Sequence, residues 1–189
     1  PDMPTLLVLG GSQGAEHINM TILRAAPELL TRYQIIHQVG ASQYDSYKEM
    51  VHMELGNNPL SERYKIFPTL NTEEYRLAAG AANLVIARAG SGTIFEIAAW
   101  ELPSILVPIP ESVSRDQHKN AYAYARTGAA EVVEQRNCTE HTLTHEIDRI
   151  LSSPETLTKM QQGAHTFQKL DAARTIAEEI MRIALAHEK

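Results

Sequence analysis

The feature that most constrains the fold of this chain is the regular alternation of short, mostly apolar segments with longer amphipathic ones. The short segments are typical of strands, and they contain few polar positions on either face. Strands of this kind suit a sheet that is covered on both sides, which is a parallel sheet. The expected strands are Thr5–Leu9, Gln34–His37, Tyr64–Phe67, Leu84–Ala87, Ser104–Val107 and Glu131–Val133.

Helical patterns fall between and after these strands. Asn71 is a plausible N-cap for the third, and Gly128 is expected to stop the fifth. Repeated strand–helix units predict an α/β fold with a doubly wound, Rossmann-like parallel sheet. We expect one unit over residues 1–189, with a core to about residue 140 and helices from about 141 to 189. The expected helices are Ala15–Leu30, Gln43–Leu55, Thr72–Ala82, Thr93–Trp100, Asp116–Thr127, Thr142–Leu151, Pro154–Leu170 and Ala172–His187.

Charge and cysteine content exclude several classes of protein. The net charge of −6 does not suit a nucleic-acid binder, whose affinity comes largely from Lys and Arg on phosphates. The single cysteine, Cys138, cannot form an internal disulfide and is expected to be a plain thiol. We find no apolar run of the length that a transmembrane helix needs. The chain begins with Pro1 directly before a strand, so we expect it to be cut from a longer protein.

The first strand-to-helix turn is rich in glycine and reads Gly10-Gly11-Ser12-Gln13-Gly14-Ala15. Glycines let the backbone approach a ligand, and a helix start offers free N–H groups to a phosphate. The turn matches neither the G-x-G-x-x-G dinucleotide fingerprint nor a Walker loop, and no acidic residue ends the next strand to hold an NAD ribose. The structural alternative is a tight turn with Ser12 as the helix cap.

A second loop of small residues follows the fourth strand and reads Arg88-Ala89-Gly90-Ser91-Gly92-Thr93. Two such loops at one edge of a sheet could hold a single anion. Arg88 could stabilise phosphate charge, and Glu96 could accept hydrogen bonds from a ribose diol. The alternatives are an ion pair for Arg88 and a capping box in which Glu96 serves Thr93.

The fifth turn is long and polar, and it places Asp116, Gln117 and Asn120 one helical turn apart, so these side chains can face the same way. The alternative is helix capping by Asp116. His141 and His145 are spaced like metal ligands but have no evident third ligand, and no Asp-x-Asp ends a strand. We therefore predict no metal and no other cofactor.

Taken in order, these turns resemble the MurG family of UDP-N-acetylglucosamine transferases, in glycosyltransferase family 28. The resemblance runs from about Thr5 to the C-terminal helices. The segments that carry it are Gly10–Ala15 with Asn19, His37–Gly40, Ala87–Ser91, Glu96–Ala99, Pro103–Pro108, Asp116-Gln117, Asn120-Ala121 and Gly128–Ala130.

The resemblance implies the C-terminal, donor-binding half of a GT-B enzyme, with the N-terminal acceptor domain absent. Ser12 and Gln13 would lie in the glycine loop against the donor, and Glu96 would hold the ribose hydroxyls. Asp116 and Gln117 would face the sugar, with Asn120 in support, and Leu70 would meet uracil. The implied contacts to UDP-N-acetylglucosamine are Gly11, Ser12, Gln13, Gly14, Leu70, Arg88, Gly90, Ser91, Gly92, Thr93, Glu96, Asp116, Gln117 and Asn120.

The resemblance also implies what the whole protein does. It would transfer N-acetylglucosamine, with inversion, to a lipid-linked muramoyl-peptide (lipid I to lipid II) in peptidoglycan synthesis, with Arg88 as a candidate stabiliser of the leaving group. It would work in the cytoplasm, at the inner membrane of a bacterium, through a peripheral contact. This chain alone would not catalyse transfer.

Three other functions stay open. A diacylglycerol glycosyltransferase shares this layout, and the Asp116-Gln117 pair favours N-acetylglucosamine over its sugar. A standalone binding subunit of a split glycosyltransferase would work with a separate membrane-anchored partner. A UDP-N-acetylglucosamine epimerase would need catalytic acids and a histidine in a cleft between domains, and the sequence shows no such set.

Overall fold

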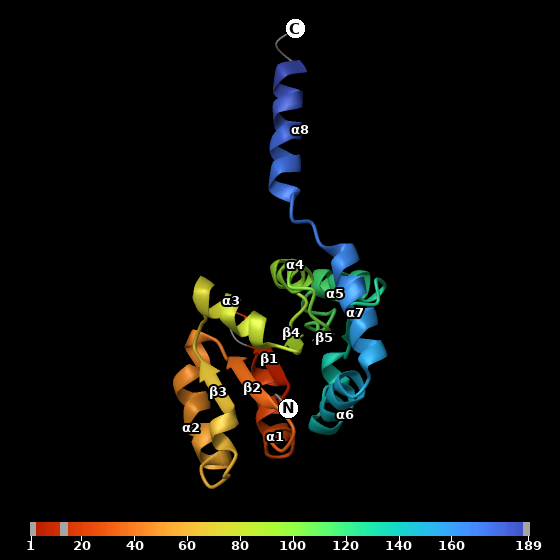
Figure 1. Ribbon diagram of the computed structural model, residues 1–189. Helices are drawn as coiled ribbons and strands as arrows, with labels where there is room; N and C mark the ends of the chain where they lie inside the picture. Colours follow the sequence, from red (N-terminus) through yellow and green to blue (C-terminus); the bar gives the residue numbers. More distant parts are fainter. Residues whose placement is uncertain (1–2, 12–14, 187–189) are drawn as a thin grey trace.

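The computed structural model describes residues 3–11 and 15–186, and its centre is a six-stranded sheet whose paired strands are all parallel (Figure 1). The order is β3-β2-β1-β4-β5-β6, so the chain runs from the centre to one edge and then returns to build the other half. This confirms the predicted doubly wound α/β fold. The strands are β1 Thr5–Leu9, β2 Gln34–Gln38, β3 Tyr64–Phe67, β4 Leu84–Ala87, β5 Ser104–Leu106 and β6 Ala130–Val132.

Helices follow each strand and cover both faces of the sheet. Three short 3-10 turns, η1 Ala41–Gln43, η2 Ser61–Arg63 and η3 Gln135–Asn137, complete the connections. The α-helices are α1 Glu16–Leu29, α2 Tyr44–Leu55, α3 Thr72–Ala81, α4 Ser91–Ala99, α5 Arg115–Ala125, α6 Glu140–Leu151, α7 Pro154–Phe167 and α8 Ala172–Ala186.

The core consists of two apolar layers that the sheet separates. Successive strand residues point to opposite faces, so Leu6 and Val8 join one layer while Leu7 and Leu9 join the other. The first layer is closed by α1, α2 and α6, and the second by α3, α4 and α5. This explains why the central strands β1 and β4 carry apolar residues at nearly every position.

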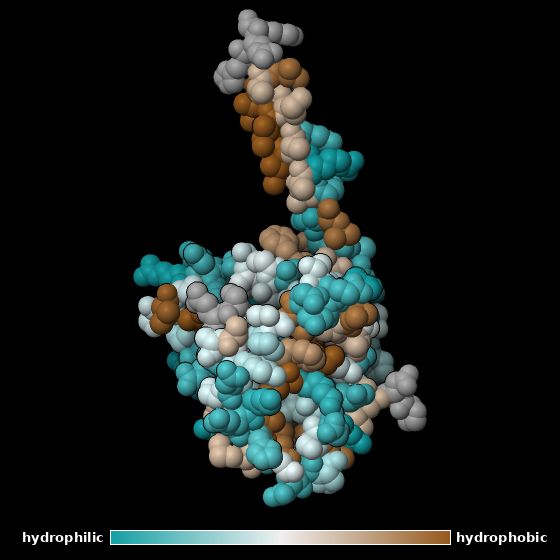
Figure 2. Space-filling model, turned by 90° about the vertical axis from the view of Figure 1, so that its left-hand side faces the viewer, coloured by the Kyte–Doolittle hydropathy of each residue, from teal (hydrophilic) through white to brown (hydrophobic). Residues whose placement is uncertain are grey.

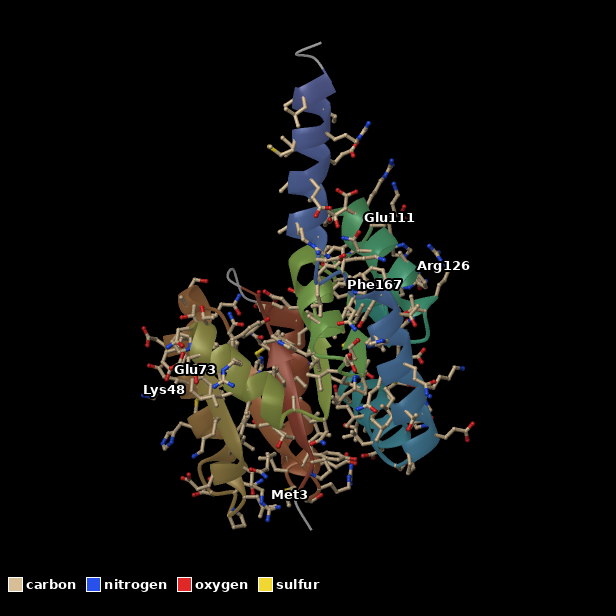
Figure 3. All side chains as sticks on the ribbon, turned by 45° about the horizontal axis from the view of Figure 1, so that its top comes forward. Met3, Lys48, Glu73, Glu111, Arg126 and Phe167 are labelled. Carbon is tan, nitrogen blue, oxygen red and sulfur yellow. The ribbon has the colours of Figure 1, made fainter. Side chains whose placement is uncertain are left out.

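Helix α7 is fitted closely against the turn before β6. A Cβ atom on Gly163 would lie 2.5 Å from the Thr127 carbonyl oxygen and 2.6 Å from the Ala129 nitrogen, so the backbones themselves are in contact there. At the end of α7, Phe167, which is labelled in Figure 3, packs edge-on against Tyr124 of α5, at 4.9 Å between ring centroids. The close approach of α7 therefore depends on the missing side chain of Gly163.

A buried polar network ties β2 and β3 to α1 and α2. His37 Nδ1 lies 2.6 Å from the Tyr64 hydroxyl, and His37 Nε2 lies 3.0 Å from Asn19 Oδ1. Tyr47 bridges the Tyr64 hydroxyl and the Asn19 main-chain oxygen, at 2.7 Å from each. Asn19 also donates to the Val39 carbonyl. Every buried polar group of the network is thus paired, which is the condition for such a network to stabilise a fold.

His37 should make the stability of the chain depend on pH. Its imidazole is buried, and burial lowers its pKa from 6.5 to about 3. The folded state therefore keeps His37 neutral, whereas the unfolded chain takes up a proton below about pH 6.5. We expect the contribution of His37 to the free energy of unfolding to be fully present above that pH. Below it, this contribution should fall by up to about 1.4 kcal/mol per pH unit until about pH 3.

Urea titrations between pH 4 and 8 measure this dependence. A His37→Gln variant cannot take up the proton, so its unfolding free energy should change less with pH than that of the parent chain. Equal pH dependence in the two proteins would show that His37 does not contribute.

Helix α8 extends away from the rest of the structure (Figure 1). Every residue from 172 to 185 is exposed, and a stripe of apolar side chains runs along one side of the helix (Figure 2). The large exposed apolar residues of this stripe are Ile176, Ile180, Met181, Ile183 and Leu185. Within the residues that the structure describes, no helix has both the length and the apolar character to span a bilayer.

Several element bounds differ from the predicted ones. Helix α4 starts at Ser91 rather than Thr93, and its N-cap is Gly90. Helix α5 starts at Arg115 with Ser114 as its N-cap, so the alternative in which Asp116 caps this helix is wrong. Helix α7 ends three residues earlier than predicted, at Phe167. The predicted N-cap Asn71 is confirmed, since its side chain accepts hydrogen bonds from two amides of the first turn of α3.

Candidate ligand site at the carboxyl end of the sheet

A cavity of about 580 Å³ lies where β1, β4 and β5 end and their helices begin. In a doubly wound sheet this is the edge at which ligands bind. It brings together five of the predicted contact residues from three separate turns: Gly11, Arg88, Gly90, Thr93 and Gln117. Its other lining residues are Gly10, Ala15, Glu16, His17, Gln43, Ile109 and Gln135.

The glycine loop forms one wall through its backbone. The Gly10 nitrogen donates to the Gln38 carbonyl at 2.8 Å, and a Cβ atom on Gly10 would lie only 2.8 Å from that same oxygen. Gly11 has φ +72°, a conformation that favours glycine. Both glycines are therefore required by the path of the loop. The predicted contacts Ser12, Gln13 and Gly14 lie outside the described residues.

The start of α4 offers main-chain donors to the same cavity. Its first turn contains Ser91, Gly92 and Thr93, whose N–H groups have no partner within the helix. No side chain in the described part of the chain caps them. The alternative of a capping box between Thr93 and Glu96 is wrong, because Thr93 is the third residue of the helix rather than its N-cap. The amides and the helix dipole together favour an anion at this point.

Arg88 brings positive charge to the cavity from the end of β4. It is half-buried and donates to two main-chain carbonyls, Val107 at 3.1 Å and Pro108 at 3.4 Å. Burial lowers the pKa of its guanidinium, but an arginine stays charged. Across residues 3–11 and 15–186 it forms no ion pair, so the predicted alternative of a structural ion pair is wrong. Its charge is available to a ligand.

Glu96 lies one helical turn beyond the cavity wall. It is the sixth residue of α4, exposed, and three positions after Thr93. Its Oε2 accepts a hydrogen bond from the Tyr75 hydroxyl of α3 at 3.0 Å. The carboxylate does not line the cavity, but it lies one helical turn from Thr93, which does.

Of the three residues predicted on α5, Asp116, Gln117 and Asn120, only Gln117 lines the cavity. Its Oε1 lies 3.3 Å from the Ile109 nitrogen, which donates to it. Asn120 is half-buried and donates to the Ala89 carbonyl at 3.4 Å, so it supports the loop before α4. Asp116 is exposed and does not line the cavity.

Leu70 lies in a different, smaller cavity of about 250 Å³ beside α3. Its walls are almost entirely apolar, and its lining residues are Ile36, Phe67, Leu70, Glu74, Leu77 and Ala78. The main cavity and this apolar one are therefore separate in the structure. A flat, largely apolar group would suit the smaller cavity.

Four polar residues of the main cavity were missed by sequence reasoning. Glu16 and His17 follow the glycine loop in the first turn of α1, while Gln43 and Gln135 follow β2 and β6. Gln43 and Gln135 lie in loops without a distinctive motif, but the general rule that ligands bind beyond the carboxyl ends of the strands could have identified them. His17 Nε2 lies 3.0 Å from the Cys138 carbonyl oxygen, so this ring nitrogen is already engaged within the fold.

Two further predictions concern cysteine and metals. Cys138 is buried, and burial raises the pKa of its thiol to about 11, which fits a plain, protonated thiol. His145 is exposed on α6. The described residues contain no group of three His, Cys, Asp or Glu side chains placed to hold a metal ion. The predicted independence from metals stays a prediction.

Comparisons with known proteins place this geometry in a family. The sequence model of the glycosyltransferase family 28 C-terminal domain matches residues 5–176. The chain is 36% identical over 183 residues to the UDP-N-acetylglucosamine–N-acetylmuramyl-(pentapeptide) pyrophosphoryl-undecaprenol N-acetylglucosamine transferase of Anaeromyxobacter sp. (strain K), covering 95% of this chain and 46% of the relative. The protein of the same name from Limosilactobacillus reuteri is 32% identical over 189 residues, covering 100% of this chain and 50% of the relative.

Solved structures agree. The Acinetobacter baumannii MurG structure matches with a TM-score of 0.78 and 27% identity, over 96% of this chain and 51% of that one. A UDP-GlcNAc 2-epimerase from Neisseria meningitidis, bound to UDP-GlcNAc, matches with a TM-score of 0.65 at 11% identity over 96% of this chain and 44% of that one, which shows the fold alone. The chain spans about half the length of the curated relatives it matches.

The fold, the turn motifs and these matches agree over most of the sequence. The chain belongs to the glycosyltransferase family 28 C-terminal domain family.

Proposed function

We propose that this chain binds a UDP-sugar, UDP-N-acetylglucosamine, as the donor half of a MurG-type transferase. One observation carries the proposal: a half-buried Arg88, which forms no ion pair among the described residues, and the start of α4, which no described side chain caps, meet at one cavity beside the glycine loop. A cation and free amides around one point suit a diphosphate. The names of the relatives, which are N-acetylglucosamine transferases, support the choice of sugar.

Each remaining part of the donor has a candidate contact. The exposed Glu96 carboxylate would accept from the ribose hydroxyls beside the cavity. Gln117 would face the sugar, with Asn120 holding the loop behind it and Asp116 reaching in from the helix surface when the sugar is bound. The apolar cavity at Leu70 would take the uracil ring.

The same groups would act during transfer. Negative charge grows on the departing UDP as the bond to the anomeric carbon breaks. Arg88 and the start of α4 line the same cavity, and they would stabilise that charge without a metal ion. The acceptor, a lipid-linked muramoyl-peptide at the cytoplasmic face of the membrane, would bind to the other half of a longer protein. On this proposal the chain alone binds the donor and does not transfer the sugar.

Calorimetric titration with UDP-N-acetylglucosamine, UDP-glucose, UDP and NAD tests the proposal, with each titration run in EDTA and again in Mg²⁺. We expect binding of the uridine nucleotides but not of NAD, a preference for UDP-N-acetylglucosamine, and the same affinity in both buffers. A preference for UDP-glucose would favour another UDP-sugar transferase, such as a diacylglycerol glycosyltransferase. Tighter binding in Mg²⁺ would overturn the metal-free site.

A Glu96→Ala variant should bind UDP about tenfold more weakly, because the ribose loses hydrogen bonds to a charged acceptor. Glu28→Ala is the matched control, since Glu28 is exposed near the far end of α1. Equal affinity of the Glu96→Ala and parent chains would contradict the ribose role. A second measurement separates a two-domain enzyme from a split one. Transfer activity is assayed on the longer protein without any added partner: activity would indicate a two-domain enzyme, and its absence a subunit that needs a separate partner.

A further inference from the structure

Tyr75 is held firmly at the start of α3. The Asn71 capping box fixes the first turn of this helix, and the Tyr75 nitrogen donates to the Asn71 carbonyl at 2.8 Å. The ring is half-buried and meets Trp100 edge-on, with 4.8 Å between centroids. Backbone and ring are therefore both constrained, and the hydroxyl has little freedom to move.

The hydroxyl of Tyr75 points at one oxygen of Glu96. It donates to Oε2 at 3.0 Å, which is the hydrogen bond that the Glu96 side chain makes within the described residues. Glu96 is otherwise exposed on the surface of α4, where a free carboxylate would sample several rotamers. A carboxylate has two oxygens with about four acceptor positions, so Oε1 and part of Oε2 stay available to a ligand.

We propose that Tyr75 is a positioning residue that orients the Glu96 carboxylate for the vicinal hydroxyls of a nucleoside ribose. The proposal rests on the proposed function, because it assigns a ligand to Glu96. A carboxylate already held in one orientation loses less rotamer freedom when it binds a diol. Burial first, and then the nearby Glu96 charge, raise the pKa of Tyr75, so its phenol stays protonated and remains a donor near neutral pH.

The test is a Tyr75→Phe variant, which removes the hydroxyl and keeps the ring against Trp100. UDP and 2′,3′-dideoxy-UDP are titrated into the parent and the variant. We expect the variant to bind UDP about three- to tenfold more weakly and to bind dideoxy-UDP with less than a twofold change. Tyr122→Phe is the matched control, because Tyr122 also donates to a carboxylate, Glu134 at 2.8 Å, and does not line the main cavity.

The outcomes separate the two claims. If the parent chain binds UDP and dideoxy-UDP equally, Glu96 does not hold the ribose, and the role of Tyr75 falls with it. If the parent prefers UDP and Tyr75→Phe keeps that preference in full, only the positioning role is overturned. If the variant weakens both ligands equally, Tyr75 is a structural residue, and a fall in its thermal midpoint relative to Tyr122→Phe would accompany that result.

Discussion

A Gly163→Ala variant should unfold with a free energy about 3 kcal/mol lower than that of the parent chain, and its thermal midpoint should fall by roughly 6–12 °C. The added Cβ would lie 2.5 Å and 2.6 Å from backbone atoms of Thr127 and Ala129. Backbone cannot rotate out of the way as a side chain can, so α7 must move off the turn before β6. The loss outweighs the gain of about 1 kcal/mol that alanine brings to a helix interior.

The control is the same substitution in another helix. Gly80 of α3 is exposed and has nothing within 4 Å of its missing Cβ, so Gly80→Ala should raise the free energy of unfolding by about 0.5–1 kcal/mol. Thermal and urea unfolding of the two variants should therefore shift in opposite directions. A shift of the same sign in both would mean that helix propensity, not the contact of α7 with the turn, sets the result.

An Arg88→Ala variant should lose at least about 30-fold in affinity for UDP, because a charged, half-buried donor to the diphosphate is removed. Uridine has no phosphate, so its affinity should change less than twofold. The guanidinium faces the cavity, forms no ion pair among the described residues, and is held by the Val107 and Pro108 carbonyls.

Arg63→Ala is the matched control for this experiment. Arg63 is also half-buried and donates to a main-chain carbonyl, Leu30 at 2.8 Å, but it lies before β3 and does not line the main cavity. It should leave UDP binding unchanged. An equal loss of UDP and uridine affinity in Arg88→Ala would show that the variant disturbs the fold of the loop rather than a phosphate contact.

The strands, their parallel pairing and the placement of the site could be predicted from the sequence. Buried parallel strands are apolar on both faces, and this pattern is unusual enough to identify them. The turn glycines were also informative. A side chain on Gly10 would collide with a neighbouring main-chain oxygen, and Gly11 has a positive φ that other residues rarely adopt. Arg88 was predicted because it stands in the second loop of small residues, between the carboxyl end of a strand and the start of a helix.

Other parts of the site could not be predicted, since they depend on distances through space. Thr93 and Glu96 match a capping box in sequence, and such a box requires Thr93 to be the N-cap of the helix. In the structure the N-cap is Gly90 and the helix begins at Ser91, so Thr93 lies inside the helix and no capping box forms. The contact between Tyr75 and Glu96 joins residues 21 positions apart, on different helices. Gln43 and Gln135 come from the ends of strands whose loops carry no distinctive motif.

The two outer strands of the sheet also affect how the protein behaves when it is concentrated. An outer strand carries unpaired N–H and C=O groups, which can recruit a strand from a neighbouring molecule and start an aggregate. Here β3 has four residues and β6 has three, and the exposed residues in them are Lys65 and Glu131. Short edge strands offer few hydrogen-bonding groups, and an exposed charge on each disfavours pairing with a strand of another molecule. The sheet should therefore resist growth by strand addition.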